Sequence, residues 1–359
     1  MHNNQSLPFL PKMKPILSLI FFFGLLNVTA QTKTQNFKSI DNRVKTIKVF
    51  SADTLALKLT SPYKTDIEKV RAIFRWITEN IAYDTKGYHD TAGIYKGLFH
   101  PEISQDRAVV DKDYNNRIVN KVLAEKKAIC DGYSRLFKTL CDYTNLKTEI
   151  ITGYIRWWDD PIGVLTKREH AWNAAFLNNK WYLLDPTWAS GTCNTEVTEF
   201  KKSYNDFYFM TDPVEFFNDH YPEDSKWSLL PNTPSLEQFY NYPFFHSDLY
   251  KFKITSVKPL NGVLEITSTN KKVRIELESS DSKKDMFIYE HPFISDSITI
   301  TVNNDSLLNS QIDELLKPPY KINGNRIIYE YEIKSDKADR LDVVYNNKLI
   351  LSYSIRFKK

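Results

Sequence analysis

Three residues in separate segments supply the side chains of a cysteine nucleophile with its base and its orienting acid. They are Cys130 in Ala-Ile-Cys-Asp-Gly-Tyr, His170 in Glu-His-Ala-Trp-Asn and Asp185 in Leu-Leu-Asp-Pro-Thr-Trp. An imidazole removes the thiol proton, and a carboxylate holds that imidazole in the tautomer that accepts the proton. Each residue alone also has a structural explanation. The prediction of catalysis therefore depends on whether the fold brings the three together.

The pattern after Cys130 predicts a helix that begins near this residue and ends by Asn145. Apolar side chains recur there at helical spacing, and they are Tyr133, Leu136, Phe137 and Leu140. Cys130 then lies in the first turn. A helix N-terminus and an adjacent imidazolium both favour the thiolate form of a cysteine. Cys141, near the other end of the same helix, is expected to be an inert core thiol.

His170 and Asp185 flank a predicted hairpin whose turn is Asn178-Asn179. Asn tolerates the positive φ that a two-residue primed turn requires. Such a turn pairs residue 177 with residue 180, so that Trp172 faces Asp185. Because alternate residues share a face, His170 and Asp185 become diagonal neighbours on one side of the sheet. A slip of one residue moves the carboxylate to the opposite face.

Two further patterns indicate the surrounding architecture. Thr65 and Glu68 form a capping-box motif ahead of an apolar stripe that runs to Ile81, which predicts an amphipathic helix. From about Tyr250, short β-branched and aromatic runs separated by turn residues predict an immunoglobulin-like β-sandwich. These runs are 251–257, 262–268, 272–277, 286–289, 297–302, 326–333, 340–345 and 348–357.

The length of 359 residues favours two globular units after removal of a processed N-terminal segment. The predicted organisation is a signal peptide over 1–30, an N-terminal arm over 31–60, a catalytic domain over 61–232, a linker over 233–249 and an all-β domain over 250–359. Residues 84–104 are expected to form a long loop.

The first thirty residues predict export. They contain no acidic residue, and an apolar run over 16–26 precedes small residues and Gln31. This is the pattern of a secretory signal, and the run is shorter than the roughly 20 residues of a membrane span. Translation could begin at Met1 or at Met13. We therefore expect a periplasmic, surface-held or secreted protein without a stable membrane span, a membrane anchor being the alternative.

Composition argues against several other classes. The formal charge is +4, or +2 without Lys12 and Lys14, which gives no electrostatic case for nucleic acid. Three cysteines are too few for a disulfide scaffold, although a pairing of Cys141 with Cys193 stays open. No zinc motif is present, and the calcium-loop-like stretch over 111–122 lacks its Gly and its final Glu. We expect no metal and no cofactor.

The sequence resembles the transglutaminase-like superfamily, whose core is related to papain-type enzymes. The segments that carry the resemblance are 127–137, 152–154, 170–173 and 181–188, together with Ile81-Ala-Tyr83-Asp84. Residues 207–213 and 220–227 resemble the branch that contains the kyphoscoliosis peptidase. The match covers roughly 60–232 and leaves the β-rich tail uncovered.

The resemblance implies an α+β core in which a helix bearing the nucleophile packs on an antiparallel sheet. It implies Cys130 as nucleophile, His170 as base and Asp185 as orienter. The backbone N–H of Cys130 is one candidate donor to an oxyanion, and Tyr83, Trp76 and Trp172 are further oxyanion or cleft candidates.

The leading hypothesis is a cysteine acyl-transfer enzyme that acts on peptide or glutamine-like amides through a thioester. Water as acceptor makes it a protease or amidase, and an amine makes it a cross-linker. The rival hypothesis is a catalytically silent scaffold or binding protein of the cell envelope. The oligomeric state is not indicated by the sequence.

Overall fold

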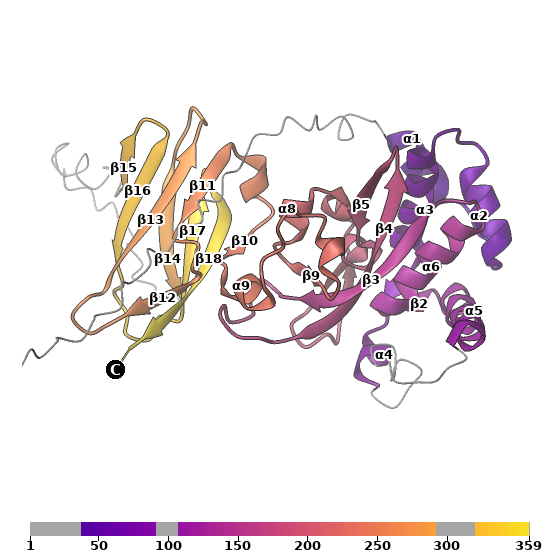
Figure 1. Ribbon diagram of the computed structural model, residues 1–359, viewed down its shortest axis with the longest axis horizontal. Helices are drawn as coiled ribbons and strands as arrows, with labels where there is room; N and C mark the ends of the chain where they lie inside the picture. Colours follow the sequence, from indigo (N-terminus) through magenta and orange to yellow (C-terminus); the bar gives the residue numbers. More distant parts are fainter. Residues whose placement is uncertain (1–36, 91–106, 292–319, 359) are drawn as a thin grey trace, which may run out of the picture.

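The computed structural model describes residues 37–90, 107–291 and 320–358. Figure 1 shows helices gathered at one end of the molecule, a sheet beside them, and two facing sheets at the other end. We refer to residues 37–232 as the α+β part and to residues 244–358 as the β-sandwich. This combination of helices and antiparallel sheets confirms the predicted fold class.

Helix α3 (Asp66–Asn80) is the centre of the helical layer and begins at the predicted capping box. The Thr65 hydroxyl accepts the N–H of Glu68, and the Glu68 carboxylate accepts the N–H of Thr65 at 3.2 Å. The box satisfies two N–H groups that a helix start leaves free. Helices α1 (Lys38–Val44) and α2 (Ala52–Thr60) pack on α3, and Leu55 and Leu59 are fully buried. The segment predicted as an N-terminal arm thus joins this core from residue 38 onward.

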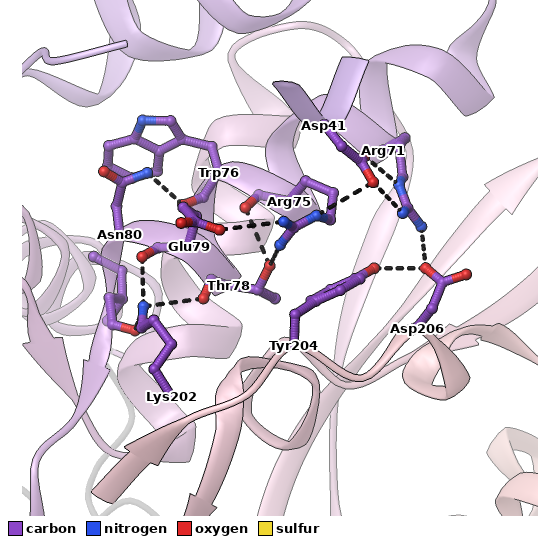
Figure 2. A network of polar contacts seen from close by, with 11 residues as sticks. Asp41, Arg71, Arg75, Trp76, Thr78, Glu79, Asn80, Lys202, Tyr204 and Asp206 are labelled. Atoms are coloured by element: carbon purple, nitrogen blue, oxygen red, sulfur yellow. Dashed lines mark hydrogen bonds and ion pairs between the residues drawn. The ribbon is translucent and has the colours of Figure 1, made fainter. Parts of the chain in front are cut away.

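Buried charges attach α3 to its neighbours (Figure 2). Arg71 donates to Asp41 of α1 at 2.9 and 2.7 Å and also to Asp206. Arg75 contacts the same Asp41 carboxylate at 3.5 Å. Lys202 donates to backbone carbonyls at the end of α3. Because each buried charge is paired, the network holds α1 and the 202–206 segment against the helix.

The five-stranded sheet of the α+β part has the order β8-β5-β4-β3-β9. Its strands are β3 (Thr148–Ile155), β4 (Arg168–Leu177), β5 (Lys180–Leu184), β8 (Phe209–Thr211) and β9 (His220–Pro222). Asn178 and Asn179 have φ of 50° and 61°, and Leu177 pairs with Lys180. The predicted hairpin register is therefore confirmed. Helix α6 (Cys130–Asp142) packs on β4.

Short elements complete the α+β part and the segment that follows it. They are β1 (Ala82–Tyr83), α4 (Thr85–His89), α5 (Arg107–Glu125), β2 (Lys127–Ala128), α7 (Pro186–Ser190), β6 (Gly191–Cys193), β7 (Phe200–Lys202), η1 (Asp206–Tyr208), α8 (Pro213–Phe216), η2 (Ser225–Ser228) and α9 (Leu236–Asn241). The calcium-loop-like stretch lies within α5 and is a helix rather than a loop. Most of the loop predicted over 84–104 falls outside the described residues.

The β-sandwich consists of two sheets. One contains β10 (Phe244–Phe245), β12 (Val263–Ile266), β14 (Met286–His291), β17 (Arg340–Tyr345) and β18 (Lys348–Phe357), and the other contains β11 (Ile254–Lys258), β13 (Lys272–Ser279), β15 (Tyr320–Asn323) and β16 (Arg326–Glu332). A one-turn helix η3 (Leu249–Lys251) follows β10. Alternate residues of β13 point into the shared core. The strand predicted over 297–302 lies outside the described residues.

The segment predicted as a linker, 233–249, fastens the two halves together. It contains α9 and β10, and β10 pairs with β18. Buried Arg156, just after β3, donates to the carbonyl oxygens of Asn218, Tyr242 and Pro243 at 2.7, 2.8 and 3.0 Å. The loop before β4 adds a hydrogen bond from the N–H of Ile162 to Ser354 Oγ at 3.0 Å. The β-sandwich is therefore held against the face of the α+β part that carries this loop.

Candidate active site

Cys130 is the first residue of α6. The chain enters the helix from β2, which pairs with β1 through Tyr83 and Ala128, and Ile129 is extended at the N-cap. The Cys130 side chain is 7% exposed and lines a cavity. The thiol therefore lies at the positive end of the helix dipole and is open on one side, as an attacking sulfur requires.

His170 connects this thiol to Asp185. The ring Nε2 lies 2.8 Å from Asp185 Oδ2. Cys130 lies close enough to the same ring to raise its pKa, and both residues line one cavity. An ionised carboxylate can only accept a hydrogen bond, so Nε2 carries a proton and Nδ1 is left for the thiol. The structure thus brings together the three residues that the sequence singled out, in the order thiol, imidazole, carboxylate.

Asp185 owes its position to the end of the hairpin. It follows β5 and is the N-cap of α7, where its Oδ1 accepts the N–H groups of Thr187 and Trp188 at 2.7 and 3.1 Å. Pro186 occupies the first helical position, which needs no N–H donor. The helix cap fixes one carboxylate oxygen, and the other oxygen is thereby directed toward His170.

The charged groups of this site shift the pKa values of His170 and Asp185. Burial acts to lower the pKa of His170, but the charges of Asp185 and Cys130, with their hydrogen bonds, outweigh it and raise the pKa to about 9. Burial acts to raise the pKa of Asp185, yet His170 and His220 hold it well below the usual range. Near neutral pH the site therefore contains an imidazolium and a carboxylate.

His220 is a member of this cluster that we did not predict as a site residue. Its Nε2 lies 3.0 Å from Asp185 Oδ2, and its Nδ1 lies 2.5 Å from Asp219 Oδ1. Tyr208 donates to the other oxygen of Asp219 at 3.0 Å. The sequence signal was the motif over 220–227, but its place next to Asp185 depends on the long-range pairing of β9 with β3.

His170, Asp185 and His220 also meet the general criteria for a metal-binding group, because their ligand atoms lie within 4.8 Å of one another. The nitrogen-to-oxygen separations of 2.8 and 3.0 Å are those of hydrogen bonds. Ligands of a metal with bonds of about 2.0–2.2 Å lie farther apart. Asp185 already accepts four donors. We therefore assign a hydrogen-bonded cluster.

A cavity of about 1290 Å³ opens onto Cys130 and His170. Its walls on the α+β part are rich in aromatic side chains, including Trp157, Trp158, Trp188 and Phe207. The β-sandwich and the segment leading into it close another wall with Phe244, Phe245, His246, Tyr250 and Leu349. Both halves of the molecule therefore line this cavity.

Several known proteins are similar to this chain in sequence. Residues 53–186 match the model of the transglutaminase-like superfamily. The kyphoscoliosis peptidase of Homo sapiens is 31% identical over 268 residues, which are 73% of this chain and 37% of that protein. This chain belongs to the transglutaminase-like superfamily. Hillarin of Drosophila melanogaster is 24% identical over 307 residues, which are 81% of this chain and 34% of that protein.

The chain spans only about a third of the length of these relatives. Among solved structures, a crystal structure of a TGase aligns with 52% of this chain and 40% of its own at 16% identity, with a TM-score of 0.26. A score this low supports no argument about shape. Membership in the transglutaminase-like superfamily therefore rests on the sequence matches.

Within the transglutaminase-like core, the three oxyanion or cleft candidates lie in different places. Tyr83 lines the cavity, and burial together with the nearby Cys130 raises its pKa well above the usual value. Trp172 is 1% exposed and stacks behind His170, with ring centroids 6.1 Å apart. Trp76 is wrong as a cleft residue, because it lies in the core and its indole donates to the carbonyl of Ile47. Tyr83 is thus the candidate that reaches the cavity.

The other two cysteines differ from Cys130. Cys141 is fully buried near the end of α6, and burial raises its pKa far above the usual value. Cys193 is partly exposed on the cavity wall. All three cysteines of the chain are described by the structure and all are free. The open pairing of Cys141 with Cys193 is therefore not formed.

In the described residues, no helix is both long and apolar enough to cross a bilayer. The predicted signal peptide lies outside these residues.

Proposed function

We propose that this chain is a cysteine acyl-transfer enzyme that acts on peptide or glutamine-like amide bonds. The observation that carries the proposal is the position of one imidazole. Its Nε2 donates to buried Asp185, and the ring lines the same cavity as Cys130, which lies at a helix N-terminus. This is the arrangement in which a thiol transfers its proton and attacks a carbonyl carbon.

The chemistry follows from these positions. The thiol proton already resides on His170 Nδ1, and Sγ adds to the carbonyl carbon of the amide. The resulting oxyanion accepts hydrogen bonds from the Cys130 N–H and the Tyr83 hydroxyl. His170 then gives its proton to the departing amine, which leaves a thioester on Cys130. Water or a second amine, deprotonated by His170, attacks the thioester and releases Cys130.

The direct test offers both acceptors at once. The mature chain is incubated with a library of peptides and a labelled primary amine, and cleavage and amine incorporation are read together by mass spectrometry. We expect products that disappear in Cys130→Ala. New peptide termini identify a hydrolase, and amine attached to glutamine identifies a cross-linker. No product with either acceptor would overturn the proposal and favour the scaffold alternative.

We also propose that the protein is exported, on the basis of the acid-free, apolar N-terminal segment. Sequencing the N-terminus of the mature protein from cell fractions tests this. Cleavage before Gln31 in an exported fraction is the expected result, and an intact N-terminus in the cytoplasmic fraction would contradict it.

A further inference from the structure

His220 lies at the centre of a buried row of ionisable groups behind the nucleophile. The row runs from Cys130 through His170, Asp185 and His220 to Asp219. Both histidines contact the same oxygen of Asp185. A simple triad ends at its carboxylate, and here the carboxylate is shared with a second imidazole.

The contacts of His220 fix its protonation. One ring nitrogen lies 3.0 Å from Asp185, the other lies 2.5 Å from Asp219, and the side chain is fully buried. A neutral imidazole has only one N–H, so it could donate to just one of two carboxylates. Two carboxylate partners therefore require both nitrogens to carry protons, which makes His220 an imidazolium.

We infer that His220, kept charged by Asp219, is a positioning residue. It divides the charge of Asp185 between two histidines and so sets the pH range in which His170 stays protonated beside Cys130. This inference rests on the proposed use of Cys130 as a nucleophile.

The physical reason is repulsion between like charges at short range. The rings of His170 and His220 have centroids 5.5 Å apart. Aromatic rings surround His220 and exclude water, with Phe216 at 4.1 Å, Trp188 at 4.7 Å and Trp172 at 5.1 Å between centroids. A positive charge at this distance in such surroundings makes a proton on His170 easier to lose, by roughly one to two pH units.

Tyr133 faces Asp185 and Tyr83 faces Cys130, and burial raises the pKa of each, so both stay neutral. Further groups lie beyond Asp219. Tyr208 of η1 donates to Asp219, and burial raises its pKa well above the usual value, so it stays neutral. Arg156 at the end of β3 and Tyr250 of η3 face the same carboxylate. On the side of the nucleophile, His170 faces Cys130. Besides His170 itself, His220 is the cation among these groups that contacts Asp185.

The test measures the rate of Cys130 carboxymethylation by iodoacetate on the full chain from pH 4 to pH 10.5. In such a profile the lower limb reports formation of the thiolate. The upper limb reports loss of the His170 proton, because the imidazolium attracts the anionic reagent. His220→Gln keeps an N–H donor toward Asp185 but removes the charge. We expect its upper limb to move up by about one pH unit or more.

Two further variants keep the test decisive. Asp219→Asn removes the charge that holds the second proton on His220, and it should move the upper limb in the same direction. His291→Gln alters a histidine that contacts Asp342 at 2.8 Å in the β-sandwich, and it should leave the profile unchanged. Protection of buried Cys141 from the reagent shows in each sample that the fold is intact.

An upper limb that stays in place or moves down in folded His220→Gln and Asp219→Asn would overturn the inference, because a purely structural His220 predicts no upward shift. A wild-type Cys130 that reacts no faster than Cys141 at every pH would instead overturn the proposed nucleophile. A shifted profile combined with no turnover of amides would uphold the role of His220 and count against the proposed function alone.

Discussion

Each half of this molecule contains a cluster of histidine and aspartate. Only one of the two clusters has the hydrogen-bond arrangement of a catalytic triad. In the α+β part, His170 connects Asp185 to the thiol of Cys130 beside the cavity. In the β-sandwich, His246, Ser352 and Asp342 supply the residue types of a serine triad.

In the second cluster the serine hydroxyl donates its hydrogen bond to the carboxylate and not to the imidazole. Ser352 donates to Asp342 at 2.6 Å and lies 2.9 Å from His246 Nε2, so the hydroxyl proton faces the carboxylate instead of the imidazole. Ser352 is also fully buried in the middle of β18. Residue types are therefore insufficient, because access and the direction of each hydrogen bond decide whether a side chain can attack.

The charge states of the two clusters also differ. Burial acts to lower the pKa of His220, but Asp219 and Asp185 outweigh it and raise the pKa to about 9. Burial of His246 lowers its pKa to about 4, because Asp342 opposes this only weakly across Ser352. An imidazole in direct contact with a carboxylate is kept charged, and one separated from it by a hydroxyl is kept neutral.

The largest expected effect comes from removing each potential nucleophile. Cys130→Ala should lower acyl transfer by a thousandfold or more, roughly to the level left by binding alone. Ser352→Ala should leave acyl transfer within about twofold and instead lower the free energy of unfolding by about 1–3 kcal/mol, since buried Asp342 loses a donor. Turnover and urea denaturation of both variants check this. Loss of turnover in folded Ser352→Ala would show that the cluster in the β-sandwich also takes part in acyl transfer.

The next effect concerns the two carboxylates. Asp185→Asn should reduce turnover by about 10²–10⁴-fold, because an amide can donate to His170 Nε2 and stabilise the wrong tautomer. Its matched control, Asp342→Asn in the β-sandwich, should keep turnover within about twofold. Steady-state kinetics on folded protein measure both. Equal losses in the two variants would show that general destabilisation, rather than tautomer control, explains the effect.

The clusters should also give opposite pH dependences of stability. His170 and His220, with pKa values raised to about 9, stabilise the fold fully below pH 6.5 and lose this contribution as the pH rises to about 9. His246, with its pKa lowered to about 4, stabilises above pH 6.5 and loses its contribution as the pH falls toward 4. Each effect should be on the order of 1–3 kcal/mol.

Urea denaturation between pH 4.5 and 9 checks these signs. His246→Gln should flatten the decline on the acid side, and His220→Gln should flatten the decline on the alkaline side. A wild-type protein that gains stability from pH 7 to pH 9 would contradict the charge states assigned to the first cluster.

The smallest effect concerns the two turns that fix the strand registers of the two clusters. Asn178-Asn179 precedes β5, and Asn346-Asn347 joins β17 to β18, where Asp342 pairs with Ser352. Asn179→Ala and Asn347→Ala should each lower the free energy of unfolding by about 1 kcal/mol, since alanine avoids positive φ. The Gly variants should be nearly neutral. A large loss of turnover in Asn179→Gly would show that the register depends on the asparagine side chain.

Much of the catalytic cluster could be predicted because local rules fix it. A helical stripe placed Cys130 at a helix start, and a two-residue turn fixed the register that relates His170 to Asp185. The parts that could not be predicted depend on long-range packing. His220 reaches Asp185 only through the pairing of β9 with β3, and no spacing in the sequence encodes that pairing.

The domain junction illustrates the same limit. A stretch rich in Pro, Asn and Tyr over 231–245 predicted a linker, yet a capping box at Ser235 starts α9, and Phe244 pairs with Ser352. Trp76 was an oxyanion or cleft candidate, but its phase on α3 directs it into the core. Composition alone could not distinguish these outcomes from the ones predicted.

The most direct test of an activated Cys130 compares three thiols in one reaction at pH 6, using limiting iodoacetamide and mass spectrometry of the full chain. Cys130 should react more than about tenfold faster than added glutathione, because an ordinary thiol is mostly protonated at this pH, and Cys141 should stay unlabelled. His170→Ala should remove the advantage of Cys130. Labelling of Cys130 no faster than that of Cys141 or glutathione would contradict the account.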